Sequence, residues 1–352
     1  MPLTNTSIKN LLICPSSSEP LILSKKKNIL HNKNHSKKYE IKENIPILFN
    51  NKNAQDIKII TWWKDLYQQL YYDFDKSLNK KNILNNLNLF EDLMKKQDHL
   101  LFTEMLQNKI REKICLEIGS GSGAHSALMK SKGARMVSVD ITFERCLSTY
   151  KKLDLINGPD SLVINCSAEN IPIKQASVDF VYSNGVLHHA DNTNRCIDEV
   201  HRVLKPNGLA IISLYCRQSA EYYFNLIPKA VIFGSIFKYK KEANWIGEIT
   251  EGKTKYSNTK NPITRVYNKN EIIDLFLNFK VISLRKHFFS YKDFAIPKLT
   301  QLRDKILNFF KCEYHEGGNI VYGRPIIPLT NNEKKLSKYF GFFWYIVVQK
   351  KS

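Results

Sequence analysis

Apolar residues recur along this chain with different spacings, and each spacing predicts a different kind of element. Between residues 56 and 112 they recur every three or four positions, which is typical of amphipathic helices. Within that segment KSLNKKNILNNLN (76–88) predicts a loop. Between residues 1 and 51, two short apolar runs separated by a Lys-rich stretch predict a small β-rich unit.

From residue 113 onward, strand and helix patterns alternate. Such alternation predicts a parallel sheet with right-handed crossovers and helices on both faces. Strands are expected at KICLEI (113–118), MVSVD (136–140), SLVIN (161–165), VDFVYS (178–183) and LAIISLY (209–215), with helices at 124–132, 143–153 and 193–204.

The pattern after residue 215 is less regular. KNEIIDLFLNF (269–279) predicts a helix, whereas KVISLRKHFF (280–289) and FFWYIVVQK (342–350) predict two more strands. The long connection between these strands predicts a lid or insertion. We therefore expect three parts, namely residues 1–51, residues 56–112, and residues 113–352 with insertions at about 218–262 and 288–338.

A glycine-rich loop follows the first strand of the alternating region, in ICLEIGSGSGAHSALMKSKGARMVSVD (114–140). Gly119, Gly121 and Gly123 permit positive φ angles and let a ligand approach the backbone. Asp140 ends the second strand, where a carboxylate can accept hydrogen bonds from a ribose diol. This arrangement suits a nucleotide-like ligand, and both NAD and S-adenosylmethionine meet it.

Glu117 distinguishes these two ligands. It lies on the strand two residues before the first glycine. A carboxylate there would repel a pyrophosphate but would suit an ammonium or sulfonium group. S-adenosylmethionine carries both cationic groups and no phosphate, so it is the preferred ligand. The alternative is that Glu117 caps the amides of the loop itself.

These residues resemble a known family. Glu117-x-Gly119-x-Gly121-x-Gly123 resembles motif I of the class I S-adenosylmethionine-dependent methyltransferases. SAENIPIKQASVDFVYSNGVLHHADNTNRCIDEVHRVLKPNGLAIISLY (167–215) resembles the rest of that core in the subgroup that includes the quinone-biosynthesis C-methyltransferases. The resemblance implies an α/β, Rossmann-like, seven-stranded and mostly parallel sheet with helices on both faces. FFWYIVVQK would be its antiparallel last strand.

The resemblance also implies which residues bind the cofactor. They are Glu117, Gly119, Gly121, Gly123, Asp140, Ala168, Glu169 and Asn184. Glu117 would lie near the methionine amino group, Asp140 would bind the ribose, and Ala168 and Glu169 would lie beside the adenine. Ser167 stands where the family often has Asp. Asn184 would mark the place where the methyl group meets the acceptor, or it would simply form a turn.

Two histidines follow the fourth strand. Methyl transfer is an in-line displacement in which the protein mainly aligns the nucleophile and excludes water, and a base is needed only if the acceptor must lose a proton. His188 or His189 could act as that base or orient the acceptor, because histidine titrates near neutrality. The alternative is that one packs under the sheet edge while the other caps the next loop.

A second segment, NPITRVYNKNEIIDLF (261–276), resembles one found in a set of bacterial methyltransferases. That resemblance implies that Arg265 and Tyr267 face the mouth of the active site. Arg265 could clamp an acidic substrate and Tyr267 could donate a hydrogen bond to it, as a catalytic residue. The alternative is that this segment merely caps the following helix at Asn268 or Asn270.

The N-terminal unit resembles the zinc-ribbon-like domain of the Trm112 type, through LLICPSSSEPLIL (11–23) and YEIKENIPILF (39–49). The CPxC motif of that domain is replaced here by Cys14 followed by Pro-Ser-Ser. His31 and His35 could join Cys14, but a closed zinc site takes four ligands. We therefore expect a metal-free remnant with a docking or scaffolding role.

Composition limits the partners. The net charge of +20 favours an acidic partner, but the lysines are spread along the chain and no Arg/aromatic strip for stacked bases occurs, so nucleic acid is not favoured. Seven scattered cysteines without a CxxC pair indicate a reduced, cytoplasmic protein. The apolar run 222–239 predicts a lid, a peripheral membrane contact or a segment buried under a helix.

Together these features predict an S-adenosylmethionine-dependent methyltransferase. Its acceptor is expected to be a small molecule of the quinone, lipid or sugar-precursor class. The alternatives are an RNA (tRNA) methyltransferase and a non-catalytic partner protein that keeps the methyltransferase fold.

Overall fold

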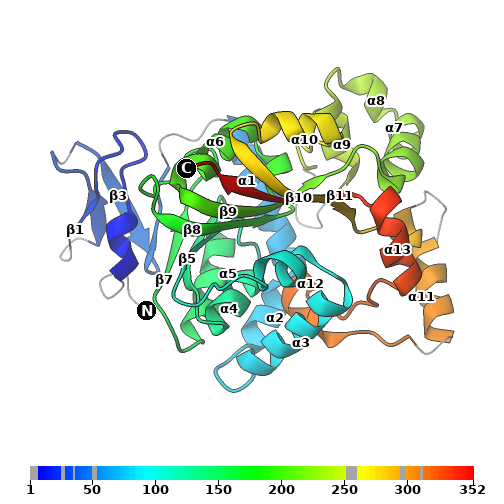
Figure 1. The fold of residues 1–352 in the computed structure, drawn as a ribbon, viewed down its shortest axis with the longest axis horizontal. Helices are drawn as coiled ribbons and strands as arrows, with labels where there is room; N and C mark the ends of the chain where they lie inside the picture. The colour runs from blue at the N-terminus through cyan, green and yellow to red at the C-terminus, as the bar shows by residue number, and fades with distance from the viewer. Residues whose placement is uncertain are drawn as a thin grey trace.

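The computed structural model describes residues 7–24, 28–34, 36–49, 54–250, 260–293, 299–309 and 312–352. Its centre is a seven-stranded sheet in the order β10–β11–β9–β8–β5–β6–β7 (Figure 1). The strands are β5 (Ile114–Ile118), β6 (Arg135–Asp140), β7 (Ser161–Asn165), β8 (Val178–Asn184), β9 (Leu204–Tyr215), β10 (Phe279–His287) and β11 (Phe343–Lys350). Strand β11 runs antiparallel to both of its neighbours, β10 and β9, and the other pairings within this sheet are parallel. The predicted fold class is confirmed, including the antiparallel strand at FFWYIVVQK.

The order of the strands reverses at β5. This strand pairs in parallel with β6 on one side and with β8 on the other. The connections that leave β5 and β8 therefore diverge to opposite faces of the sheet. In open parallel sheets, such a reversal leaves a crevice at the carboxyl ends of the strands, where ligands bind.

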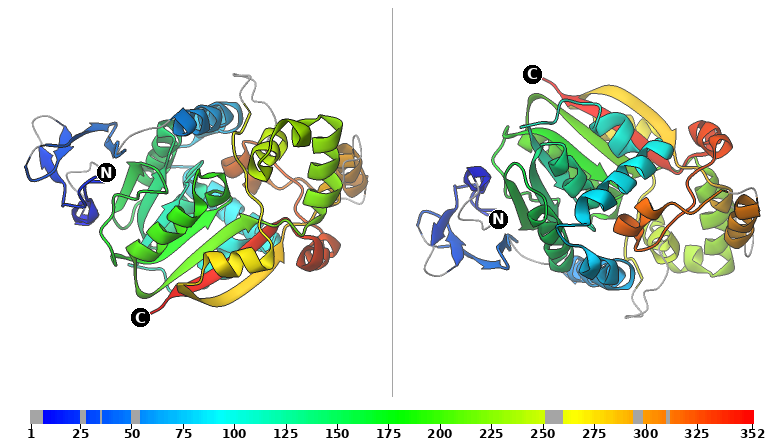
Figure 2. Two further views of the ribbon diagram at one scale, coloured as in Figure 1. Left: turned by 90° about the horizontal axis from the view of Figure 1, so that it is seen from above. Right: turned by 90° about the horizontal axis from the view of Figure 1, so that it is seen from below.

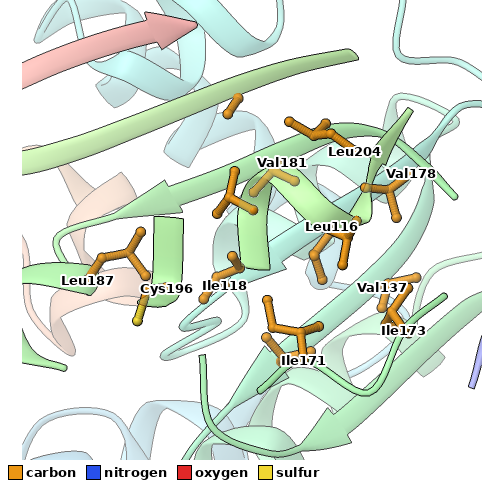
Figure 3. Close-up of a cluster of buried hydrophobic side chains, with 14 of the residues drawn as sticks. Leu116, Ile118, Val137, Ile171, Ile173, Val178, Val181, Leu187, Cys196 and Leu204 are labelled. Atoms are coloured by element: carbon orange, nitrogen blue, oxygen red, sulfur yellow. The ribbon is translucent and has the colours of Figure 1, made fainter. Parts of the chain in front are cut away.

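Helices cover both faces of the sheet because neighbouring strand residues point to opposite sides. Leu116 and Ile118 face α6 (Thr193–Val203) and α10 (Lys269–Leu275), and Figure 3 shows part of this cluster. Cys115 faces the other side, where α3 (Ile83–Lys96), α4 (Ala124–Ser131) and α5 (Phe143–Asp154) pack. No described helix is both long enough and apolar enough to span a bilayer.

The N-terminal unit is an antiparallel sheet in the order β1–β2–β3–β4, preceded by a 3-10 turn, Ser7–Leu11. Its strands are β1 (Ile22–Ser24), β2 (Ile29–His31), β3 (Lys38–Lys42) and β4 (Ile45–Pro46). The β-rich prediction is confirmed. The unit packs against β7, the edge strand of the large sheet, and the Leu48 amide donates to the Asn165 carbonyl at 2.9 Å. This contact pairs part of an edge that would otherwise remain open.

Cys14 is fully buried in this unit. Its Sγ lies 3.2 Å from the Ser16 Oγ and 3.2 Å from the Tyr39 hydroxyl. Burial raises the pKa of the thiol, but hydrogen bonds from Ser16, Ser17 and Tyr39 outweigh burial and bring the pKa down to about 7. His31 Nδ1 lies 3.0 Å from the Asn32 carbonyl, and His35 lies outside the described residues.

Helices follow this unit, as predicted for residues 56–112. They are α1 (Ala54–Leu70), α2 (Tyr72–Ser77), α3 and a π-helical turn, Leu101–Met105. The predicted loop at 76–88 is wrong in its second half, because α3 begins at Ile83. Ile83, Leu87 and Phe90 recur at helical spacing and are buried in the core that also contains α4. Burial of this apolar face therefore overrides the local abundance of Asn.

The two insertions are helical, and α7, α8, α9, α11 and α13 lie at the end of the molecule opposite the N-terminal sheet, whereas α12 lies beside α2 and α3 (Figures 1 and 2). The first has a π-helical turn, Glu221–Leu226, followed by α7 (Ile227–Ile232), α8 (Ser235–Lys238) and α9 (Glu242–Thr250). The second has the 3-10 turns Tyr291–Asp293 and Glu316–Gly318 with α11 (Leu299–Phe309), α12 (Asn319–Tyr322) and α13 (Asn331–Phe340).

A buried ion pair joins α11 to α13. The Glu333 carboxylate is fully buried and accepts hydrogen bonds from the Arg303 Nε at 2.7 Å and Nη2 at 2.6 Å. Burial raises the pKa of Glu333, but Arg303 and neighbouring donors outweigh burial and lower the pKa to about 2. The pair therefore stabilises the fold above the unfolded-state pKa near 4.5, and this stability is lost as the pH falls toward 2.

We expect Glu333→Gln to lower the free energy of unfolding by about 3 kcal/mol at neutral pH, because it leaves the Arg303 charge buried and unpaired. Urea denaturation followed by tryptophan fluorescence measures the difference. Glu313→Gln, at an exposed position, is the control and should leave the midpoint unchanged. An equal effect of both variants, or a difference that does not shrink on acidification toward pH 2, would contradict the assignment.

Candidate functional site

A cavity of about 400 Å³ lies at the reversal of strand order. Its wall includes the glycine loop (119–122), Asp140 at the end of β6, residues 166–169 after β7 and residues 184–186 at the end of β8. Helix α1 covers it. A volume of this size is typical of sites for small molecules.

Packing within the protein explains two of the three glycines. All three have positive φ, at 75°, 55° and 79°. A Cβ on Gly119 would lie 2.4 Å from a Val186 methyl, and a Cβ on Gly123 would lie 2.6 Å from the Thr149 Cα. Gly119 and Gly121 line the cavity, whereas Gly123 packs against α5. Packing against Val186 and Thr149 therefore determines the shape of the loop. This shape leaves the backbone at Gly119 and Gly121 exposed to the cavity.

Glu117 lies behind the cavity wall. It is 1% exposed and accepts a hydrogen bond from the Ser126 Oγ of α4, rather than from the loop amides. Its other oxygen lies 3.4 Å from the His125 Nδ1. His125 lines the cavity whereas Glu117 does not, so the influence of this carboxylate on a ligand passes through His125 or through its negative field.

Asp140 lines the cavity at the position expected for a ribose-binding carboxylate. One oxygen accepts the Gly121 amide at 3.0 Å and the other accepts the Thr142 amide at 2.9 Å. Burial raises the pKa of Asp140, while Arg145 and the two amides oppose the shift. A carboxylate has about four lone-pair sites, so it keeps capacity for further donors such as a diol.

Arg145 is a buried cation that the sequence did not reveal as a site residue. It is 8% exposed, its Nε donates to the Trp63 carbonyl at 3.3 Å, and its guanidinium lies 4.8 Å from the Trp63 ring centroid. Its Nη2 has no hydrogen-bond partner in the part of the chain that the structure describes. The available signal was an Arg on the buried face of the helix that directly follows Asp140.

Aromatic and apolar side chains form the part of the cavity wall that faces the glycine loop and Asp140. Trp63 and Leu66 of α1 and Tyr71 after it line the wall, with Tyr322 of α12 and Phe343 of β11. The sequence predicted only an amphipathic helix here, because apolar residues at helical spacing look the same in a core and in a cavity wall.

His189 is the one predicted catalytic residue that lines this cavity. Its Nδ1 lies 3.0 Å from the Thr264 Oγ1 and 3.1 Å from the Asn261 side-chain nitrogen. Its Nε2 is buried without a partner among the described residues. Burial lowers the pKa of His189 to about 3, so the ring is neutral at physiological pH.

His188 points elsewhere. It is fully buried, its ring centroid lies 3.8 Å from that of Tyr215, and it does not line the cavity. Burial lowers its pKa well below the ordinary value. This position matches the alternative in which one of the two histidines packs under the sheet edge.

Arg265 and Tyr267 also lie away from the main cavity and line a separate depression beside α10. The Arg265 guanidinium donates to the carbonyl oxygens of Ala190 and Asp191, next to His189. Asn268 caps α10, as the alternative reading of this segment held. Arg265 therefore holds the loop that carries His189. Burial raises the pKa of the Tyr267 hydroxyl.

The remaining predicted cofactor residues do line the cavity. These are Ala168, Glu169 and Asn184. Burial raises the pKa of Glu169, whose carboxylate accepts the Asn192 amide at 2.9 Å. The Asn184 side-chain oxygen accepts the Ser213 hydroxyl at 2.8 Å, which fixes the side chain at the end of β8.

Comparison with known proteins gives a match to one family model. Residues 116–212 match the methyltransferase domain. The chain is 24% identical over 193 residues to demethylmenaquinone methyltransferase of Staphylococcus epidermidis, covering 52% of this chain and 78% of that protein. It is 27% identical over 104 residues to malonyl-[acyl-carrier protein] O-methyltransferase of Hamiltonella defensa, covering 30% and 38%. The chain spans less than two thirds of the length of most curated relatives that it matches.

Solved structures are also similar. One is a chain from the complex between the Haloferax volcanii Trm112 methyltransferase activator and a methyltransferase, with a TM-score of 0.47 at 14% identity, covering 86% of this chain and all of that chain.

The buried position of His189 predicts an unusual titration. The unfolded chain takes up a proton near pH 6.5, but the folded ring does so only near pH 3. The His189 resonance in a ¹³C-edited NMR titration should therefore stay constant between pH 8 and about pH 5, and His189→Gln identifies it. A midpoint near 6.5 would mean that the ring is exposed to solvent.

Proposed function

We propose that this chain, in which residues 116–212 match the methyltransferase domain, transfers a methyl group from S-adenosylmethionine to a small-molecule acceptor. One observation carries the proposal. The cavity where the strand order reverses is lined mainly by the matched segment, which contributes the glycine loop, Asp140 and residues 166–169.

The donors and acceptors in the cavity fit this cofactor. Asp140 would hold the ribose hydroxyls, Ala168 and Glu169 would lie beside the adenine, and Gly119 and Gly121 would support the chain of the cofactor. When bound, the cofactor would supply an electrophilic methyl group on a sulfonium centre. The charge of Arg145 opposes the rise in the pKa of Asp140 that burial causes, and so favours the ionised carboxylate.

Other residues of the wall would act on the acceptor. His189 presents an unpaired Nε2 in neutral form. With its Nδ1–H donating to the Ile263 carbonyl, Nε2 can accept a hydrogen bond that orients an acceptor hydroxyl. Trp63, Leu66 and Phe343 exclude water from the same space. Asn184, held by Ser213, lies at the end of the strand between these groups.

Both the cavity and the relatives support a small acceptor. The wall is rich in apolar and aromatic side chains, and the relatives named above act on a quinone precursor and on a carrier-bound malonyl group. The second candidate is an RNA acceptor, favoured by the net charge of +20 and by similarity to a tRNA U34 carboxymethyltransferase over 29% of the chain.

The N-terminal unit has a scaffolding role in this proposal. Its contacts run to the edge strand β7 and to residues 170–173, which adjoin the segment beside the adenine position. Pro15 accepts a hydrogen bond from the Asn170 side chain at 3.0 Å. The resemblance to the Trm112-type domain remains part of the proposal and predicts that the unit supports the fold of its own chain.

Asp140→Ala should weaken S-adenosylmethionine binding by about 10- to 100-fold, because charge-assisted hydrogen bonds to the ribose are lost. Isothermal titration calorimetry measures this, with a thermal melt to show that the variant is folded. Asp198→Asn, at an exposed position on α6, is the matched control. Undiminished binding by Asp140→Ala would refute the ribose assignment, and absence of binding by the parent would favour a non-catalytic protein.

His189→Gln should reduce methyl transfer by about 10-fold while leaving cofactor affinity unchanged, because the hydrogen bond that orients the acceptor is lost. The assay is transfer of radiolabelled methyl groups into a cell extract that is then separated into RNA, protein and small molecules. His188→Gln should retain most of the activity, since its ring lies outside the cavity. Label in the RNA fraction would favour the second candidate.

A further inference from the structure

The outer surface of the first insertion carries large exposed apolar side chains. Ile232, Phe233 and Phe237 are 74%, 74% and 80% exposed. Gly234 has a φ of 72° and turns the chain between α7 and α8, so these side chains gather at one tip. We call residues 231–237 the α7–α8 tip. Clusters of exposed apolar residues on a monomer usually mark an interaction surface.

Positive charge surrounds the α7–α8 tip. Residues 222–241 contain four lysines, Lys229, Lys238, Lys240 and Lys241, and no Asp or Glu. Among the nearby acids, Glu242 pairs with Arg217, and Glu248 pairs with both Lys260 and Lys238. Glu221 accepts a hydrogen bond from the Asn225 side chain. Lys240 and Lys241 are exposed and have no carboxylate partner among the described residues.

A second apolar stripe lies at the same end of the molecule. On α11, Leu302 and Ile306 are 51% and 47% exposed on consecutive turns, with Lys305 between them. Figures 1 and 2 show α7, α8 and α11 together at the end opposite the N-terminal sheet. An apolar tip beside lysines, at one end of a basic protein, matches the chemistry of an anionic lipid surface.

The inner face of the same insertion adjoins the functional site. Leu226, Ala230 and Trp245 form a buried cluster with Tyr215, and Tyr215 lines the cavity. Only this helical layer separates the cavity wall from the α7–α8 tip. A surface bound by the tip would therefore lie close to the site.

We propose that the α7–α8 tip docks this protein on an anionic membrane surface and that the methyl acceptor is a small molecule dissolved in that membrane. Ile232, Phe233 and Phe237 enter the boundary between headgroups and acyl chains, and Lys229, Lys240 and Lys241 contact lipid phosphates. The docking stands on the surface alone. The statement about the acceptor rests on the proposed function.

Vesicle flotation tests the docking. The purified full chain should float with vesicles of phosphatidylcholine and phosphatidylglycerol in equal parts and should remain unbound with phosphatidylcholine alone. Added salt should weaken the binding, because screening shortens the range of the lysine charges. Failure of the parent to float with anionic vesicles would overturn the proposal.

Two variants separate the apolar and electrostatic contributions. Phe233→Asp with Phe237→Asp should abolish flotation, and Lys240→Glu with Lys241→Glu should lower the vesicle partition coefficient by roughly fivefold or more for each lysine. Leu84→Asp is the control, since Leu84 is 54% exposed on α3. Equal loss in the control and the tip variants would overturn the assignment of the surface.

Two further measurements complete the test. Light scattering without lipid should show the same mass for the parent and the Phe233→Asp, Phe237→Asp variant. A dimer that this variant dissociates would instead identify the tip as a contact with a second copy. Calorimetry with S-adenosylmethionine should give equal affinity for both proteins. Flotation by a parent that does not bind the cofactor would leave the docking intact and refute only the acceptor.

Discussion

The contact between Gly119 and Val186 is the constraint on which the site depends. The two residues belong to the loops that leave β5 and β8, where the strand order reverses. A Val186 methyl occupies the space where any side chain at position 119 would begin, so the two loops approach at backbone distance. This approach places the Gly121 amide on Asp140 and brings the ends of β5, β6 and β8 to one cavity.

Some polar side chains around the cavity have hydrogen-bond partners within the protein, and others do not. Glu117 is buried behind the wall, with Ser126 and His125 as partners, and forms part of the support. In the wall itself, the Arg145 Nη2 and the His189 Nε2 are buried without partners among the described residues. Buried polar groups without partners are costly, and a ligand in the cavity would be able to supply partners to both atoms.

Long-range contacts orient the side of the cavity that carries His189. The segment 261–265 holds His189 through the side chains of Thr264 and Asn261, and Arg265 ties down the carbonyl groups that follow it. Helix α1 covers the opposite side and is attached to α5 through Arg145 and Trp63. The site thus brings together α1, which precedes the sheet in sequence, and the segment 261–265, which follows β9. Both insertions pack around it.

The local pattern of the sequence was sufficient for the strands, the glycine loop, Asp140 and residues 168–169. These features depend on neighbours within one strand–loop–helix unit, whose spacing is set by backbone geometry. The local pattern did not predict that Arg145 and Trp63 line the cavity. It also did not separate His189 from His188, which are adjacent in the chain but point to different surroundings. The position of Arg265 and Tyr267 outside the cavity and the early start of α3 were likewise decided by packing between distant segments. Only the folded chain determines which side of a buried helix or loop faces empty space, because side chains of the same type and spacing fill a core equally well.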